Sequence, residues 1–295
     1  MASVTQEAGP ARELLPAGPD DRYFDYCLEP YAPRRPPAGK LRAENLLWRS
    51  LEVAGCLSAF HAPLKAVQAH LGRDLTVWGV KFDGSRLWWE LYFYDPAKED
   101  AAATATALSR ALEPYLRIAP KVRESIPYMM VSFDLYPDSF ERGSVEVLNL
   151  YLTGTSEHAG RSYTLDRSGF SLQNTYRFMG PKTEIDRVLP LLKSSVFVDY
   201  GDPRKLAQVL LPQLFACKKV CVAKKRSCDA VYFSGIDVSR LLWFLRRFGY
   251  PAPLVDFVAA QREGFEHLWF DVGIDYRDDE DGNLVYLKTS FYGTL

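Results

Sequence analysis

Apolar and polar positions alternate strictly along several stretches of this chain. The clearest is RLWWELYFY at residues 86–94. In an extended backbone, Trp88, Glu90, Tyr92 and Tyr94 share one face, and every residue between Leu87 and Phe93 on the other face is apolar. The pattern predicts a strand with one apolar face and one aromatic face that carries a carboxylate.

The same period of two recurs in paired segments, which predicts β-hairpins. Asp83-Gly84 separates the first pair, and Asp-Gly favours the tight turns that match strand twist. The predicted hairpins pair residues 75–82 with 86–94, 128–136 with 144–154, 162–166 with 169–179, 219–225 with 229–235, and 267–276 with 283–293. The pattern therefore predicts ten antiparallel strands.

Helical periodicity fills most of the gaps between the hairpins. Helices are predicted within 43–72, broken between Gly55 and Pro63, and at 98–117, 182–194, 203–216, 238–248 and 253–264. Hairpins that alternate with helices indicate an α+β fold with an antiparallel sheet covered by helices. Because an open sheet of ten strands would leave two exposed edges, we expect a closed β-barrel surrounded by helices. Residues 20–295 would form this single domain, preceded by a disordered tail at 1–19.

Polar residues and tyrosines share one face of several predicted strands. The sets are Glu90 with Tyr92, Asp134 with Tyr136, Asn149 with Tyr151, Asn174 with Tyr176, and Lys288 with Ser290 and Tyr292. Such faces suit a wide, solvent-accessible lumen, with the apolar faces packed outward on helices. The alternative is the solvated face of an ordinary two-layer sheet, although such a face usually carries more Lys, Thr and Glu than Tyr.

Composition narrows the classes of partner. The chain has 295 residues, is 47% hydrophobic and carries a net charge of −1, which gives no case for binding nucleic acid or an anionic membrane. It holds no apolar run of about 18 residues, the length that a membrane span needs. The first twenty residues lack the basic start and apolar middle of a signal peptide, so a cytoplasmic protein is expected.

Metal and nucleophile motifs are not evident. The five cysteines and four histidines are scattered, which argues against a disulfide framework or a structural zinc site. The acidic run RDDED at 277–281 falls on a predicted hairpin turn, where a solvated role is favoured. No glycine-rich phosphate loop or nucleophile elbow is present. No metal-ligating residue is therefore predicted.

Several segments, together with the repeated helix–helix–strand–strand order, resemble the ABBA aromatic prenyltransferases, and most closely the cyanobactin-type peptide prenyltransferases. The similar segments are FDYCLEPYAP, VWGVKFDGSRLWWELYFY, DAVYFSG, WFDVGIDY and LVYLKTSFYG. The resemblance implies a ten-stranded PT barrel. It also implies transfer of a dimethylallyl or similar group from an allylic diphosphate to an aromatic or hydroxyl acceptor, either a small molecule or a peptide, in natural product biosynthesis.

The resemblance also suggests site residues. A diphosphate needs converging cations, and an allylic cation needs dry aromatic walls. The predicted diphosphate-binding residues are Lys81, Arg177, Lys224 and Lys288, of which Arg177 falls on the face opposite Tyr176. The predicted aromatic shield and acceptor contacts are Trp88, Tyr92, Tyr136, Tyr151, Tyr176, Tyr232 and Tyr292. Glu90 is the predicted catalytic base. Mg²⁺ is compatible with this chemistry because it neutralises diphosphate.

Two other functions remain open. Glu90, Asp134, Asn149 and Asn174 stand where these enzymes typically place Lys or Arg beside a tyrosine, which favours a non-catalytic barrel that binds a hydrophobic or aromatic small molecule. Alternatively, the Pro- and aromatic-rich residues 1–42 could dock the protein in a biosynthetic assembly.

Overall fold

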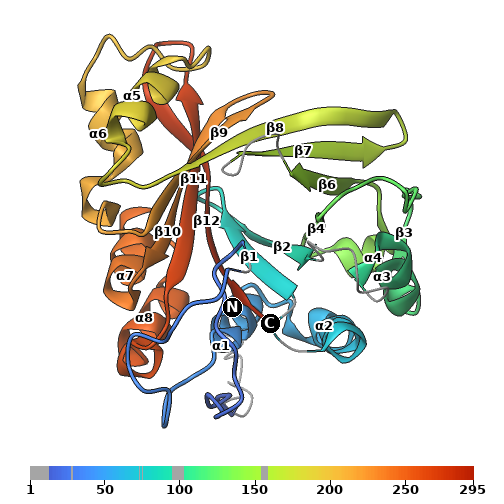
Figure 1. Cartoon of the computed structure of the whole chain (residues 1–295). Helices are drawn as coiled ribbons and strands as arrows, with labels where there is room; N and C mark the ends of the chain where they lie inside the picture. The colour runs from blue at the N-terminus through green and yellow to red at the C-terminus, as the bar shows by residue number, and fades with distance from the viewer. Residues whose placement is uncertain (1–12, 28, 73, 75, 95–102, 154–158) are drawn as a thin grey trace, which may run out of the picture.

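Ten antiparallel strands close into a barrel (Figure 1). The computed structural model describes residues 13–27, 29–72, 74, 76–94, 103–153 and 159–295. The barrel strands are β1 (Thr76–Phe82), β2 (Leu87–Tyr94), β4 (Met130–Leu135), β6 (Leu148–Thr153), β7 (Ala159–Asp166), β8 (Gly169–Met179), β9 (Lys219–Lys225), β10 (Asp229–Ile236), β11 (Phe270–Asp278) and β12 (Leu284–Thr294). Their order around the barrel is β1-β12-β11-β10-β9-β8-β7-β6-β4-β2. The predicted α+β class and the ten-stranded antiparallel barrel surrounded by helices are confirmed.

Helices pack on the outside of the barrel. They are α1 (Glu44–Val53), α2 (Leu57–Leu71), α3 (Ala105–Leu112), α4 (Ser139–Arg142), α5 (Ile185–Lys193), α6 (Arg204–Leu210), α7 (Val238–Arg247) and α8 (Ala252–Ala260). Figure 1 shows α5 to α8 along one side and α1 to α4 around the other, whereas β7 and β8 extend away from the helices. None of the helices in the described ranges has the length and apolar character needed to cross a bilayer.

Some element boundaries differ from the prediction. The first helical region breaks at Gly55, where φ is +71°, and α2 continues through Pro63. Pro212 ends α6 early and begins a short 3-10 turn. The segment predicted as one strand at 144–154 is two pieces, because β5 (Ser144–Val145) pairs in parallel with β3 (Arg117–Ile118) outside the barrel. Residues 98–102, predicted as helix, lie outside the described residues.

The side chains of β2 alternate between the outer core and the lumen, as the sequence predicts for residues 86–94. Trp89, Leu91 and Phe93 are 1% exposed and belong to the large core between barrel and helices. There the indole of Trp89 donates to the Ser50 hydroxyl at 2.8 Å and meets the ring of Phe60 edge-on. The residues between them, including Glu90 and Tyr92, face the lumen. The apolar face thus anchors β2 to α1 and α2 and leaves its aromatic and acidic face for the barrel interior.

The segment before the first helix is packed against the barrel. Residues 1–12 of the predicted disordered tail lie outside the described residues, but residues 13–19 differ from that prediction. Leu15 packs against the outer core and exchanges hydrogen bonds with Asn45, and Pro16 bridges to Leu41. Leu15 and Asn45 bury each other, which gives these residues a fixed place.

Candidate functional site

A tyrosine-lined cavity of about 120 Å³ occupies the lumen. Five of the seven aromatic residues predicted for the site line it: Tyr92, Tyr151, Tyr176, Tyr232 and Tyr292. Their rings follow one another around the wall with centroids 6.0–6.3 Å apart. Burial raises the pKa of each of these phenols, so the hydroxyls stay neutral. The wall is aromatic with polar tips, as the sequence predicts.

Two glycines on the lumen face make room for these rings. A Cβ at Gly79 would lie 2.8 Å from Cε1 of Tyr292, and a Cβ at Gly273 would overlap the ring of Tyr232. Each glycine lies directly opposite its tyrosine in the strand register. The rings can therefore lie flat across neighbouring strands, which leaves open space at the centre of the barrel.

Trp88 and Tyr136 lie apart from this cavity. Their rings stack on each other at 6.2 Å. Tyr136 lines a separate cavity of about 270 Å³, together with Asp134 and Asn149. The structure thus places these two predicted aromatic residues at a different opening from the other five.

Lys81 forms the first of two charged groups in the lumen. It comes from β1 and contacts the carboxylates of Glu90 on β2 and Asp134 on β4, with a distance of 2.7 Å to Asp134. Glu90 also accepts hydrogen bonds from the hydroxyls of Tyr92 and Ser132. Burial lowers the pKa of Lys81, but the two carboxylates outweigh that effect and hold it well above its ordinary value. Lys81 is therefore a buried cation with fixed partners.

Glu90 and Asp134 differ in their capacity to accept a proton. Burial opposes ionisation of Glu90, yet Lys81 and the hydroxyl donors hold the pKa of Glu90 at about 2. Burial, together with the Glu90 charge, raises the pKa of Asp134 above 3.8 despite Lys81. The side chain of Asp134 is 29% exposed and that of Glu90 is 4% exposed. The base role of Glu90 stays a prediction. Of the two carboxylates, that of Asp134 is the more accessible.

Asp275 on β11 organises the second charged group. Its Oδ2 atom accepts from Lys225 at 2.7 Å and from Lys288 at 3.0 Å. Burial opposes ionisation of Asp275, but the two lysines bring its pKa to about 2. The pKa of Lys288 is lowered by burial, an effect that the Lys225 and Lys81 charges reinforce. Lys288 is thus a lumen lysine whose charge is opposed by its surroundings.

Three lysines converge on the cavity: Lys81, Lys225 and Lys288. Lys81 and Lys288 are among the predicted diphosphate-binding residues. Lys225 is not, because the prediction names its neighbour Lys224. Lys224 shares the outward face of β9 with Val220 and Val222 and pairs with Asp229 at 2.7 Å. Cys221 and Ala223 share the inward face with Lys225, so strict alternation from these small residues is the signal that would have found it. Arg177 also lies on the outer face, opposite Tyr176.

The N-terminal segment closes one end of the lumen. The ring of Tyr26 stacks over Tyr232 at 6.2 Å and lies 5.5 Å from the ring of Tyr292. Its backbone N–H donates to Asp271 at 2.9 Å, and its carbonyl accepts from the Tyr94 hydroxyl. No periodic pattern predicts the position of Tyr26, because this residue lies outside the regular strands.

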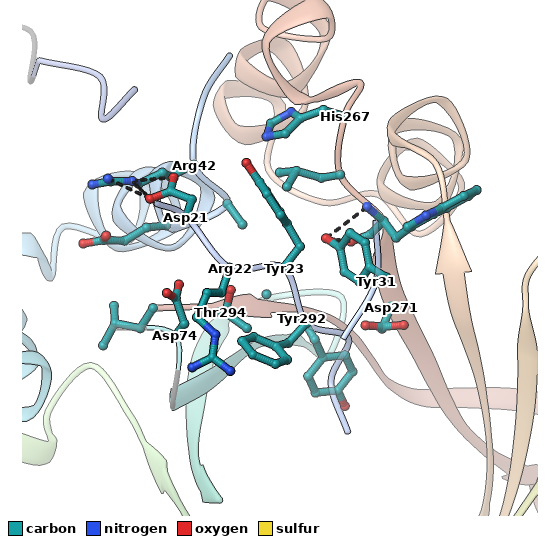
Figure 2. A pocket seen from close by; sticks show the side chains of 17 residues that line it. Asp21, Arg22, Tyr23, Tyr31, Arg42, Asp74, His267, Asp271, Tyr292 and Thr294 are labelled. Carbon is teal, nitrogen blue, oxygen red and sulfur yellow. Dashed lines mark hydrogen bonds and ion pairs between the residues drawn. The ribbon is translucent and has the colours of Figure 1, made fainter. Parts of the chain in front are cut away.

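A second pocket lies under the same segment, between the first helix and the end of β12 (Figure 2). Figure 2 shows the hydroxyl of Tyr23 pointing toward the imidazole of His267. Among the residues that the structure describes, neither ring nitrogen of His267 finds a hydrogen-bond partner of regular geometry, and the Tyr23 hydroxyl finds none. The pocket holds about 30 Å³, enough for one water molecule. It is too small for a substrate. The lumen is the candidate site because the tyrosine rings and the buried lysines meet there.

The carboxylates that could bind a metal near the lumen already contact lysines. Within the ranges described, no three His, Cys, Asp or Glu side chains gather as a metal site would require. In the lumen, Glu90, Asp134 and Asp275 each contact a lysine. This donor set does not fit a magnesium ion held by the protein alone. Any diphosphate in the lumen would be met first by lysines.

Comparisons with known proteins give a limited result. No family profile and no curated protein matches this sequence. Among solved structures, the crystal structure of NotF prenyltransferase is similar, with a TM-score of 0.47 and 11% identity over 74% of this chain and 80% of that one. At this level of similarity no function is transferred.

We predict that the buried His267 makes the fold acid-sensitive. Burial, with help from the Lys40 charge, lowers its pKa from 6.5 to about 4. In that pH window the unfolded chain binds a proton that the folded chain excludes, so stability is lost as the pH falls. The full effect is on the order of 3 kcal/mol. Urea unfolding should show a smaller loss between about pH 7.5 and about pH 4.5 for His267→Leu than for the natural chain.

The exposed His61 supplies the control. His61→Leu should keep the pH dependence of the natural chain, because this side chain stays in water. Equal pH dependence of His267→Leu and the natural chain would show that His267 carries no such linkage.

Proposed function

We propose that the protein is a prenyltransferase that moves an allylic group from its diphosphate to an aromatic or hydroxyl acceptor. The observation that carries the proposal is the convergence of Lys81, Lys225 and Lys288 on a cavity walled by tyrosines. The ammonium groups would hold the diphosphate through charge-assisted hydrogen bonds. The tyrosine rings would stabilise the developing allylic cation through their faces and keep water away from it.

The lysine–carboxylate pairs would position the cations before substrate binds. Asp275 holds two ammonium groups on one oxygen atom, and Lys81 is held from two sides. Such a preorganised site stabilises charge on the leaving group without reorganising its own groups. Loss of diphosphate then leaves the allylic cation, which the acceptor attacks as it gives up a proton.

We assign the proton acceptor to Asp134. It is the more exposed of the two carboxylates around Lys81 and has a raised pKa, which suits a base better than the strongly held Glu90. Asp134 lines the separate cavity with Tyr136 and reaches the lumen cavity through its ion pair with Lys81. Glu90 would act as a positioning residue that orients Lys81 and the Tyr92 hydroxyl. Mg²⁺ remains a proposal for the diphosphate itself, and no step is assigned to it.

A second candidate function is binding without catalysis. Each lumen lysine is already paired with a carboxylate, which would suit a neutral aromatic ligand. An aromatic compound that binds tightly while allylic diphosphates do not would favour this alternative.

Donor binding can be measured by calorimetry with dimethylallyl S-thiolodiphosphate, an unreactive donor analogue, with and without Mg²⁺. Lys225→Met and Lys288→Met should each weaken binding about tenfold or more, because each removes a charge-assisted hydrogen bond. Lys121→Met should leave binding unchanged, because Lys121 is exposed and does not line the lumen cavity. Absence of binding to the natural chain in both buffers would overturn the proposal.

Turnover separates the two carboxylates. With dimethylallyl diphosphate and a panel of tyrosine- and tryptophan-containing peptides, Asp134→Asn should lower kcat about a hundredfold while donor affinity is retained. In the natural chain the rate should fall as the pH drops through the raised pKa of Asp134, because the protonated acid cannot accept a proton. Glu90→Gln should chiefly weaken donor binding. The reverse pattern would return the base role to Glu90.

A further inference from the structure

A further cavity, of about 180 Å³, lies on the outer face of β7, β8 and β9. Its polar lining is basic: Arg161, Arg177 and Lys224, together with the Thr175 hydroxyl. Leu191 of α5 and Val222 supply apolar surface. Arg177 and Lys224 are among the residues predicted to bind diphosphate, but both lie at this outer cavity and not in the lumen.

Strand register brings the basic side chains together. Thr175 on β8 lies opposite Arg161 on β7 and opposite Lys224 on β9. Arg177 is two residues further along β8 on the same face. Neighbouring strands are about 4.8 Å apart, so these side chains share one small patch of the outer surface.

The two arginines have no compensating charge among the residues that the structure describes. Neither side chain makes a hydrogen bond or ion pair with any residue of the described ranges, and no acidic residue among those ranges lines the cavity. Lys224 differs, because Asp229 already neutralises it at 2.7 Å. The positive charge available to a ligand is therefore that of Arg161 and Arg177, whose planar guanidinium groups match a carboxylate.

The outer cavity adjoins the lumen. Gly160 and Arg161 line both cavities, at the start of β7. Inside the lumen, Lys81, Lys225 and Lys288 are paired with carboxylates, but on this outer side the arginines have no ion-pair partner within the described part of the chain. A molecule whose aromatic part enters the lumen at Gly160 would therefore meet uncompensated positive charge beside the entrance.

We propose that Arg161 and Arg177 form a site for a carboxylate of the acceptor. The acceptor class is then an aromatic compound or peptide with a carboxylate beyond the ring that reacts. The apolar surface of Leu191 and Val222 would cover the linking part. The carboxylate site itself stands on the outer cavity, and its link to catalysis rests on the prenyltransferase function proposed for the lumen.

Fluorescence polarisation can test the site with two labelled peptide amides, each with one tyrosine, followed either by aspartates or by asparagines. The natural chain should bind the acidic peptide about five- to tenfold more tightly, as expected for paired guanidinium–carboxylate contacts near the surface. Arg161→Gln combined with Arg177→Gln should abolish the preference. The matched control, Arg110→Gln combined with Arg123→Gln, removes equal charge from exposed positions that line neither cavity and should keep it.

Three results would overturn the proposal: equal binding of the two peptides by the natural chain, a preference that survives in the Arg161 and Arg177 variant, or an equal loss in the control. Displacement of the acidic peptide by inorganic phosphate at the same concentration would assign the site to free phosphate instead, and would also overturn it. The donor analogue should bind the single variant Arg177→Gln as it binds the natural chain, because Arg177 does not line the lumen cavity. Failure of donor binding with an intact peptide preference would reject the lumen function and leave the carboxylate site standing.

Discussion

Closure of the barrel is the constraint on which the rest of this structure depends. A closed sheet gives every strand one face in the lumen and one against the outer layer, and alternate residues must satisfy both environments. Trp89 and Phe93 meet helices, whereas Glu90 and Tyr92 between them meet the lumen. Because side chains alternate along a strand with a period of two, moving a charged residue by one position would transfer it from the lumen to the outer face.

Burial of charge in the lumen follows from that constraint. Lys81 and Glu90 are 5% and 3% exposed, and each would be costly to bury alone. Their contact, extended to Asp134, and the grouping of Lys225 and Lys288 around Asp275 let the barrel hold cations next to aromatic rings. Removal of one partner from such a pair typically costs about 3–5 kcal/mol. The same pairs that bury these charges also hold the ammonium groups beside the cavity, where the proposed diphosphate would bind.

Features that depend on the periodicity of the sequence could be predicted from it. Features that depend on the pairing of strands or on irregular segments could not. The ten strands, the tyrosine wall, Lys81 and Lys288 follow from alternation. Lys225 was missed because two adjacent lysines end β9 and the choice between them needed the inward positions of Cys221 and Ala223. Asp275 was missed because its importance comes from strand pairing with Lys288, which no single strand reveals. Tyr26 enters the lumen from an irregular segment held by Asp271 and Tyr94, so no periodic pattern could place it.

The proposed function requires diphosphate to bind inside the barrel on lysines and not on the basic outer face. A crystal structure of the protein with dimethylallyl S-thiolodiphosphate tests this most directly. We predict both phosphates among the ammonium groups of Lys81, Lys225 and Lys288, with the prenyl group against the tyrosine rings. Phosphates bound to Arg161 and Arg177 on the outer face, with no analogue in the lumen, would contradict it.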